Sequence, residues 1–138
     1  MSTFEELKLT RQYLNAIEDA EYSTPTEIQI KAIPRILAGQ DVIGIAQTGT
    51  GKTAAYLLPL LQTLKYAQGN EARCLILVPT KELVVQVERS LATLATYTDL
   101  RWVALFGGIG PKAQIEKLQS GVDLIVATPG RFLELYSK

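Results

Sequence analysis

An α/β fold built around a parallel sheet is the fold class that the sequence predicts, and three observations carry that prediction. Four short apolar runs rich in Val, Ile and Leu lack polar alternation, which is typical of parallel strands covered on both faces. Segments with a helical spacing of apolar residues separate these runs. A glycine-rich turn follows the first run and leads into such a segment. Strands that alternate with helices form βα units, and βα units build a parallel sheet.

The expected elements follow one another in a regular order. We expect strands at residues 42–46, 74–78, 102–106 and 124–127. We expect helices at residues 52–66, 81–96, 112–119 and 131–137, because apolar residues recur there at every third or fourth position.

Two more helices are expected ahead of the first strand. One starts after Thr10, a residue type that caps helices, and the other starts near Thr26. Pro34 should kink or split the second of these helices, because proline lacks the backbone donor that helix interiors need. Gly39 is expected to end it.

Length and composition limit the possible classes of protein. The 138 residues suit one compact domain, and we expect a helical region at 1–40 and a βα core at 41–138. The 14 basic and 14 acidic residues cancel, so any nucleic-acid contact must come from local patches. The sequence contains no His, which excludes His-centred triads and His metal sites, and its single cysteine, Cys74, excludes Cys-cluster zinc sites. Without an apolar run of about 18 residues or a signal-peptide segment, we expect a cytoplasmic domain that does not enter a membrane.

The strongest motif is AQTGTGKT at residues 46–53, after an expected strand and at the start of an expected helix. Backbone N–H groups of such a turn, together with a helix N-terminus, form a cradle for anions. Lys52 and Thr53 are the expected catalytic residues, with Lys52 on the β- and γ-phosphates and the Thr53 hydroxyl on Mg²⁺. The general P-loop pattern has Gly where this chain has Ala46. A plain βα turn would need only the Thr-Gly-Thr-Gly part, so the Lys-Thr that follows favours a phosphate site.

The Ala-x-Thr-Gly-x-Gly-Lys-Thr form of this motif is found in helicases, and other segments extend the likeness. YSTPTEIQ at residues 22–29 resembles the adenine-recognition motif of DEAD-box RNA helicases. Phe4 lies 17 residues before position 21, where that family also places an aromatic residue. The family usually has Gly at position 21, and this chain has Glu21.

Three downstream segments complete the resemblance. PTKEL at residues 79–83 is similar to the family's Pro-Thr-Arg-Glu-Leu, and the Gly pair at 107–108 and TPGR at 128–131 match two further motifs. The chain thus contains five motifs in the family's order, from residue 4 to about residue 133. It resembles the N-terminal RecA-like half of a DEAD-box ATP-dependent RNA helicase. The resemblance implies a RecA-like P-loop NTPase fold, with a parallel sheet flanked by helices and incomplete at its C-terminal end.

The resemblance also indicates which parts of the enzyme are missing. In the family, the Asp-Glu-Ala-Asp motif, the Ser-Ala-Thr motif and a second RecA-like domain with arginine fingers lie beyond the Thr-Pro-Gly-Arg element. No strand expected here ends in an acid that could hold Mg²⁺ for hydrolysis, and Asp123 stands at the opposite end of its strand. We therefore expect the ATP-binding half of an RNA helicase, which cannot hydrolyse ATP alone and acts with the second RecA-like domain of its parent chain.

For the nucleotide, the resemblance implies that Gln29 hydrogen-bonds the adenine edge and that Tyr22 stacks on the ring. A carboxamide offers a donor and an acceptor, which match adenine N7 and the N6 amino group but not guanine. Thr26 and Gln29 also form a capping-box pattern at a helix start, and different atoms of Gln29 could serve both roles. The residues expected to bind ATP or ADP are Phe4, Tyr22, Thr24, Gln29, Gln47, Thr48, Gly49, Thr50, Gly51, Lys52 and Thr53.

For RNA, the resemblance implies backbone contacts at the ends of the later strands. Helix N-termini, hydroxyls and a nearby Lys or Arg suit phosphates and read no bases, so we expect sequence-independent binding. Lys81 keeps the charge of the family's Arg but lacks its planar fork. From the residues alone, Pro-Thr and Thr-Pro are equally well explained as strand stops and helix caps. The expected RNA contacts are Pro79, Thr80, Lys81, Gly107, Gly108, Thr128, Pro129, Gly130 and Arg131.

Two other functions fit part of the sequence. A short, non-catalytic module that binds nucleotide and RNA would differ from the helicase half only in the residues beyond Lys138. A small P-loop kinase or GTPase fits less well, because the sequence has no Asn-Lys-x-Asp guanine motif and no acid directly after an expected strand.

Overall fold

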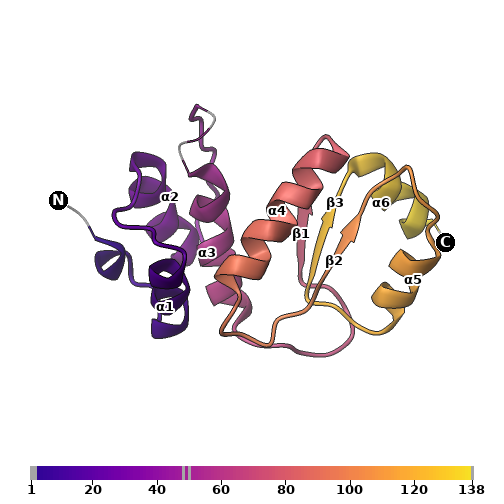
Figure 1. The fold of residues 1–138 in the computed structure, drawn as a ribbon, viewed down its shortest axis with the longest axis horizontal. Helices are drawn as coiled ribbons and strands as arrows, with labels where there is room; N and C mark the ends of the chain where they lie inside the picture. The colour runs from indigo at the N-terminus through magenta and orange to yellow at the C-terminus, as the bar shows by residue number, and fades with distance from the viewer. Residues whose placement is uncertain (1–2, 48, 50, 138) are drawn as a thin grey trace. The chain divides into compact units, whose positions relative to one another are not determined.

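The computed structural model describes residues 3–47, 49 and 51–137 of the chain (Figure 1). These residues form two compact units. The first unit comprises the described residues of Met1–Lys65 together with Ser90–Thr98, and the second comprises those of Tyr66–Arg89 and Asp99–Lys138. Among the described residues, no helix has both the length and the apolar character needed to cross a membrane.

The first unit is helical. Its elements are the 3-10 helix η1 (Phe4–Leu7) and the α-helices α1 (Arg11–Asp19), α2 (Glu27–Leu37) and α3 (Lys52–Leu64), and it shares α4 (Lys81–Leu94) with the second unit. Apolar side chains at helical spacing, such as Ile33 of α2 and Leu57 and Leu61 of α3, are fully buried and form its core. The side-chain amide of Gln62 joins α3 to the turn before α1: it accepts from Thr10 N–H at 2.8 Å and donates to Lys8 O at 3.0 Å.

The helices expected from the sequence are present. Thr10 and Thr26 are the N-cap residues of α1 and α2, although neither hydroxyl makes a cap hydrogen bond. The α2 helix continues through Pro34 and ends at Leu37, so the expected split does not occur. Gly39 follows the helix with a φ of 83°, the left-handed conformation that glycine adopts most easily.

The strand expected at residues 42–46 does not form, and that prediction is wrong. These residues have no regular secondary structure, and the side chains of Ile43 and Ile45 are both 92% exposed. A strand is stabilised by backbone hydrogen bonds to a neighbouring strand. No other described residue pairs with this segment in that way, because the sheet contains three strands that all lie later in the chain.

The second unit contains this sheet. Its strands β1 (Cys74–Leu77), β2 (Trp102–Leu105) and β3 (Leu124–Ala127) are arranged in the order β1-β3-β2, and β3 runs parallel to both neighbours. Three of the four predicted strands, those at 74–78, 102–106 and 124–127, are therefore confirmed, and so is the parallel sheet. Leu77 and Leu105 are both in register with Ala127, so the three strands end at the same level.

Helices flank the sheet of the second unit. The helices α5 (Lys112–Gln119) and α6 (Pro129–Tyr136) pack on one face, where Val103, Leu105 and Ala127 contact Leu135 in a buried apolar cluster. The α4 helix lies on the other face (Figure 1). The edge strand β1 is less covered than the sequence suggested, since Leu75 is 43% exposed and Leu77 is 50% exposed.

Candidate functional site

The predicted phosphate cradle lies at the start of α3. Gly51 is the N-cap residue of α3, with a φ of 81°, and no side chain of a described residue forms a cap hydrogen bond at this helix end. Gly49 also has a positive φ, of 84°, and Gln47 is exposed. Lys52 is exposed and Thr53 is half-buried in the first turn. The other two predicted members of the cradle, Thr48 and Thr50, lie outside the described residues.

Gln29 connects the predicted adenine motif to this turn. It is 4% exposed, its Oε1 accepts from Thr26 N–H at 3.0 Å, and its Nε2 donates to Gly51 O at 3.1 Å. A Cβ added at Gly51 would overlap the amide of Gln29, so position 51 requires glycine for space as well as for its positive φ. The cap role expected for Gln29 is therefore present. The same amide also holds Gly51, the last residue of the predicted phosphate-binding turn before α3 (the phosphate turn).

The two hydrogen bonds to described residues use only part of the Gln29 amide. A carboxamide has two donor hydrogens and two acceptor lone pairs. Each of the two hydrogen bonds uses one donor or one acceptor. Beyond these two bonds to described residues, the amide has one more donor and one more acceptor, which is the pair that the N7 and N6 edge of adenine requires.

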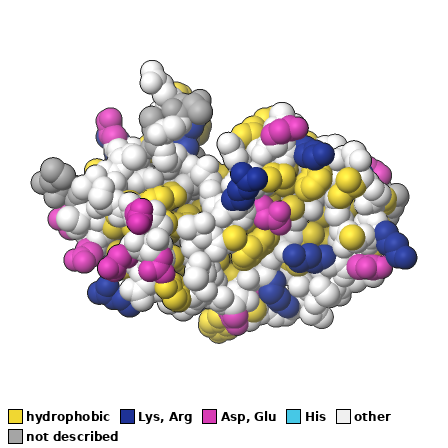
Figure 2. All heavy atoms as spheres, viewed as in Figure 1, with side chains coloured by type: hydrophobic (Ala, Val, Ile, Leu, Met, Phe, Trp, Pro, Cys, Tyr) yellow, Lys and Arg dark blue, Asp and Glu magenta, His cyan; other side chains and the backbone are white. Residues whose placement is uncertain are grey.

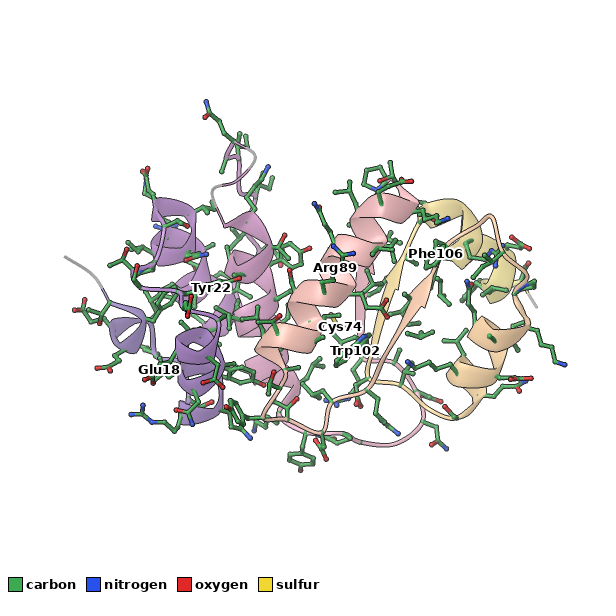
Figure 3. All side chains as sticks on the ribbon, in the orientation of Figure 1. Glu18, Tyr22, Cys74, Arg89, Trp102 and Phe106 are labelled. Atoms are coloured by element: carbon green, nitrogen blue, oxygen red, sulfur yellow. The ribbon has the colours of Figure 1, made fainter. Side chains whose placement is uncertain are left out.

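The predicted aromatic residues of the nucleotide site lie together. Tyr22, labelled in Figure 3, follows α1. Its side chain is 41% exposed, whereas Phe4 of η1 is 6% exposed. Their ring centroids are 6.5 Å apart, with a tilt of 32° between the planes, so Phe4 supports Tyr22 from the core side. Thr24, two residues further on, is exposed.

Acidic side chains surround these rings. Phe4 and Tyr22 line a hollow of about 580 Å³, whose charged lining residues are Glu5, Glu18, Glu21 and Arg11. Figure 2 shows acidic side chains gathered over η1 and α1. Three carboxylates against one guanidinium make this lining acidic on balance, which disfavours an anionic group relative to an uncharged one.

The phosphate turn faces a different space. Lys52 and Thr53 line a second cavity, of about 390 Å³, together with apolar residues of α2 such as Ile28 and Ile36. This cavity shares no lining residue with the hollow at Phe4 and Tyr22. The structure therefore brings Gln29 to the phosphate turn and Phe4 to Tyr22, and no hydrogen bond between described residues joins these two groups directly.

The predicted RNA contacts gather at the carboxyl edge of the sheet in the second unit. Val78 N–H donates to Ala127 O, and Thr128 N–H donates to Leu105 O, both at 3.0 Å, so the chain stays in register just past the strands. The segments that leave the three strands at this edge are therefore neighbours, as expected for a ligand site in a parallel sheet. These segments carry Pro79, Thr80, Lys81, Gly107, Gly108, Thr128, Pro129 and Gly130.

Two helix N-termini open at this edge. The hydroxyl of Thr80 accepts from Leu83 N–H at 3.2 Å and caps α4. Thr128 is the N-cap residue of α6, but its hydroxyl makes no cap hydrogen bond. Lys81 is exposed, and its Nζ lies 5.8 Å from the ring centre of Phe106, the residue that follows β2 (Figure 3). This cation–π contact holds the Lys81 charge near the edge.

Arg131 differs from the other predicted RNA contacts because it is buried, at 9% exposure. Its Nη1 donates to Gln114 Oε1 at 3.1 Å and its Nη2 donates to Ile109 O at 2.9 Å. Its Nε forms an ion pair, though not a hydrogen bond, with Glu134 at 3.3 Å. The guanidinium is thus engaged within the protein.

Sequence reasoning missed Gln114, which is 5% exposed and donates to Phe106 O at 3.1 Å. A signal was present in the sequence. Gln114 lies next to Ile115 and four positions before Leu118, so it belongs to the side of α5 that packs on the core. A polar residue on that side needs a hydrogen-bond partner inside the protein.

Comparisons with known proteins place the chain among helicases. The pattern that defines the DEAD/DEAH box helicase family matches residues 26–138. The chain is 43% identical over 135 residues to the ATP-dependent RNA helicase dbp10 of Schizosaccharomyces pombe, covering 97% of this chain and 16% of that protein. It is 44% identical over 133 residues to the ATP-dependent rRNA helicase RRP3 of Scheffersomyces stipitis, covering 96% of this chain and 27% of that protein.

Solved structures agree with these relatives. A DEAD box protein from Methanococcus jannaschii superposes with a TM-score of 0.90 and 34% identity, over 98% of this chain and 37% of that one. A hypothetical ATP-dependent RNA helicase from Sulfolobus tokodaii superposes with a TM-score of 0.84 and 36% identity, over 94% of this chain and 37% of that one. The chain therefore spans well under half the length of the relatives that it matches.

Proposed function

Because the chain belongs to the DEAD/DEAH box helicase family, we propose that it is the nucleotide-binding part of an ATP-dependent RNA helicase. Its first unit binds an adenine nucleotide, and its second unit binds the phosphate backbone of RNA. The observation that carries this proposal is the hydrogen bond from Gln29 to Gly51 O, which links the adenine motif to the phosphate turn.

The residues at the start of α3 fit a nucleotide phosphate with Mg²⁺. Gly49 and Gly51 have the positive φ of a phosphate-binding turn, and among the described residues no side-chain cap occupies the N-terminus of α3. Lys52 would neutralise the β- and γ-phosphates, and the Thr53 hydroxyl would hold Mg²⁺. ATP would supply the phosphate bond whose hydrolysis drives the helicase cycle. Gln29 would read adenine with its remaining donor and acceptor, and Tyr22 would stack on the base.

The second unit fits a nucleic-acid backbone. Its carboxyl edge combines the exposed Lys81, two helix N-termini and glycines that keep backbone groups open. All of these features suit phosphates, and none of them distinguishes one base from another. The chain carries equal numbers of acidic and basic residues, so affinity would depend on this edge.

A nucleotide titration tests the first half of the proposal. Gln29→Glu keeps the acceptor for Thr26 N–H but loses the donors for Gly51 O and for adenine N7. We expect wild type to prefer ADP over GDP, and we expect this preference to be lost in Gln29→Glu. Lys52→Ala is the matched control, because it should weaken ADP and GDP by the same factor. An unchanged preference for ADP in Gln29→Glu would refute adenine recognition by Gln29.

Salt-dependent RNA binding tests the second half. Affinity for single-stranded oligouridylate and oligoadenylate should be similar and should fall steeply with salt, because counterions are released from phosphates. Lys81→Gln should make the slope of log affinity against log salt shallower by about 0.7, which is the value for one contact on a single strand. Lys117→Gln, an exposed lysine of α5, is the control and should change nothing. A strong preference for one base sequence would contradict the backbone-only contacts.

A further inference from the structure

We propose that Gln114 and Arg131 form a positioning pair, which holds the loop at residues 106–111 in the conformation that binds RNA phosphates without itself touching RNA. This inference rests on the proposed RNA binding by the second unit. It assigns Arg131 to a different task from the direct contact that its sequence motif suggested, and it gives a role to Gln114.

The loop at residues 106–111 needs external support. It joins β2 to α5 without regular secondary structure, and residues 107–110 are exposed. Three of its residues are glycines, and Gly108 has a φ of 89°. A Cβ added at Gly107, Gly108 or Gly110 would meet nothing within 4 Å, so neighbouring side chains do not confine the loop. Glycine-rich segments of this kind lose much conformational entropy when they are held in one shape.

Two buried side chains provide this support. Gln114 Nε2 donates to Phe106 O at 3.1 Å, and Arg131 Nη2 donates to Ile109 O at 2.9 Å. These two carbonyl groups lie on either side of Gly107 and Gly108 in the sequence. Both ends of the glycine pair are thus tied to side chains that come from α5 and α6.

The two supports are joined to each other. Arg131 Nη1 donates to Gln114 Oε1 at 3.1 Å, so the amide and the guanidinium form one continuous bridge under the loop. Hydrogen bonds from a charged donor are stronger than those between neutral groups. Each side chain holds one carbonyl group of the loop and also bonds to the other, so the loss of either removes one support directly and weakens the second.

Burial separates this role from direct contact. Gln114 is 5% exposed and Arg131 is 9% exposed, and the charge of Arg131 is balanced by Glu134 at 3.3 Å. An RNA phosphate that replaced Glu134 would have to reach a group with almost no accessible surface. The loop backbone that the pair holds is exposed and can present its N–H groups to phosphate oxygens.

The experiment compares two Gln→Met variants of α5. Gln114→Met keeps the side-chain volume but removes both hydrogen bonds of the bridge. Gln119→Met makes the same chemical change at an exposed position of the same helix. Hydrogen exchange of the amides at residues 107–110, RNA affinity by fluorescence anisotropy with single-stranded oligouridylate, and the thermal midpoint are measured for both variants and for wild type.

We expect faster exchange at residues 107–110 in Gln114→Met and an affinity for RNA about tenfold lower, the factor that corresponds to one hydrogen bond of ordinary strength. The slope of log RNA affinity against log salt should stay at the wild-type value, because Gln114→Met removes no positive charge that neutralises an RNA phosphate. Gln119→Met should match wild type in every measurement. Equal RNA affinity in the two variants, or unchanged exchange in Gln114→Met, would overturn the proposal.

Arg131→Gln is the second variant and decides the outcome if Gln114→Met fails to fold. A positioning residue predicts lower affinity with an unchanged salt slope, whereas a direct phosphate contact predicts a slope shallower by about 0.7. The shallower slope would overturn the proposal. If wild type does not bind oligouridylate at all, the proposed RNA function fails, and the exchange of residues 107–110 alone decides whether Gln114 and Arg131 hold the loop.

Discussion

Glu21 occupies a backbone conformation that disfavours its side chain. Its φ is 61°, in the left-handed region, where a residue with a Cβ costs roughly 1–2 kcal/mol. The conformation is needed because the chain turns there: Tyr22 N–H donates to Ile17 O at 3.1 Å and Glu21 N–H donates to Glu18 O at 3.0 Å. This pair of bonds is the Schellman arrangement that ends α1 and usually places glycine at this position.

Glu21→Gly should therefore stabilise the protein. Glycine relieves the left-handed strain, but it also loses about 0.5–1 kcal/mol of chain entropy on folding, so the expected net gain is between zero and about 1.5 kcal/mol. Urea denaturation measures the free energy of unfolding. Glu21→Ala is the control, because it removes the same charge and keeps the Cβ. Equal stability of the two variants would show that charge, rather than backbone strain, governs this position.

Tyr13 provides a second prediction about a single residue. Its side chain is 1% exposed, and its hydroxyl has no hydrogen-bond partner among the described residues. Burial raises the pKa of Tyr13 to about 12, so the hydroxyl stays protonated. Tyr13→Phe should leave the free energy of unfolding unchanged or raise it by about 1 kcal/mol, because an unpaired buried hydroxyl carries a desolvation penalty. A loss of stability in thermal denaturation would mean that the hydroxyl has a partner.

At the level of the elements, Asp123 organises the amino ends of the strands. It precedes β3 and is fully buried. Arg73, next to the start of β1, donates to its Oδ1 at 3.0 Å, and Arg101, next to the start of β2, donates to its Oδ2 through N–H at 2.9 Å. Gln68 N–H adds a bond to Oδ1 at 3.1 Å. One carboxylate thus ties all three strand starts and the loop before β1 together.

These partners make the stability depend on pH. Burial raises the pKa of Asp123, but the hydrogen bonds from Arg101, Arg73 and Gln68 outweigh it and hold the pKa well below its ordinary value of 3.8. Below about pH 4 the unfolded chain therefore binds a proton at this residue while the folded protein does not. The free energy of unfolding should fall as the pH drops below that value.

Asp123→Asn should remove this part of the pH dependence. The variant should also lose about 2 kcal/mol of stability at pH 7, since the arginines lose a charged partner. Urea denaturation of both proteins between pH 3 and pH 7 measures the effect. If the two proteins lose stability in parallel below pH 4, other carboxylates are responsible.

For the whole molecule, the exposed apolar residues of the segment at 42–46 have a consequence in solution. Ile43 and Ile45 are each 92% exposed, and exposed apolar segments without a strand partner promote association. We expect the chain to self-associate at high concentration in sedimentation equilibrium. The double variant Ile43→Ser with Ile45→Ser should reduce association. Leu133→Ser, at a 63% exposed position of α6, is the control and should not reduce it.

The proposed function also predicts that the chain alone does not hydrolyse ATP. Among the described residues, no Asp or Glu directly follows a strand at the carboxyl edge, and Asp123 lies at the opposite edge. Arginine fingers, which the family supplies from a second domain, contribute about 10³–10⁵ in rate. We expect phosphate release from ATP at the level of Lys52→Ala, with or without single-stranded RNA. Turnover above that level would require another acid to complete the site.

Local features of this protein could be predicted from the order of its amino acids. Apolar periodicity placed three strands and all the α-helices within a few residues of their observed bounds, because that signal resides in neighbouring side chains. Turn chemistry located Gly51 at the start of α3, and the capping pattern predicted the bond between Gln29 and Thr26. The order of βα units also placed the predicted RNA contacts at one edge of a sheet, since parallel strands share that edge.

Features that depend on distant partners required the three-dimensional arrangement. Residues 42–46 have the composition of a strand, but strand formation needs a neighbour, and no described residue provides one. Arg131 looks like a phosphate ligand in its motif, yet partners 17 and 22 positions away draw its guanidinium into the protein. Gln114 carried no motif at all. Its place on the packed side of α5 indicates only that it needs a partner, whereas its actual partners, Phe106 O and Arg131, depend on positions in space.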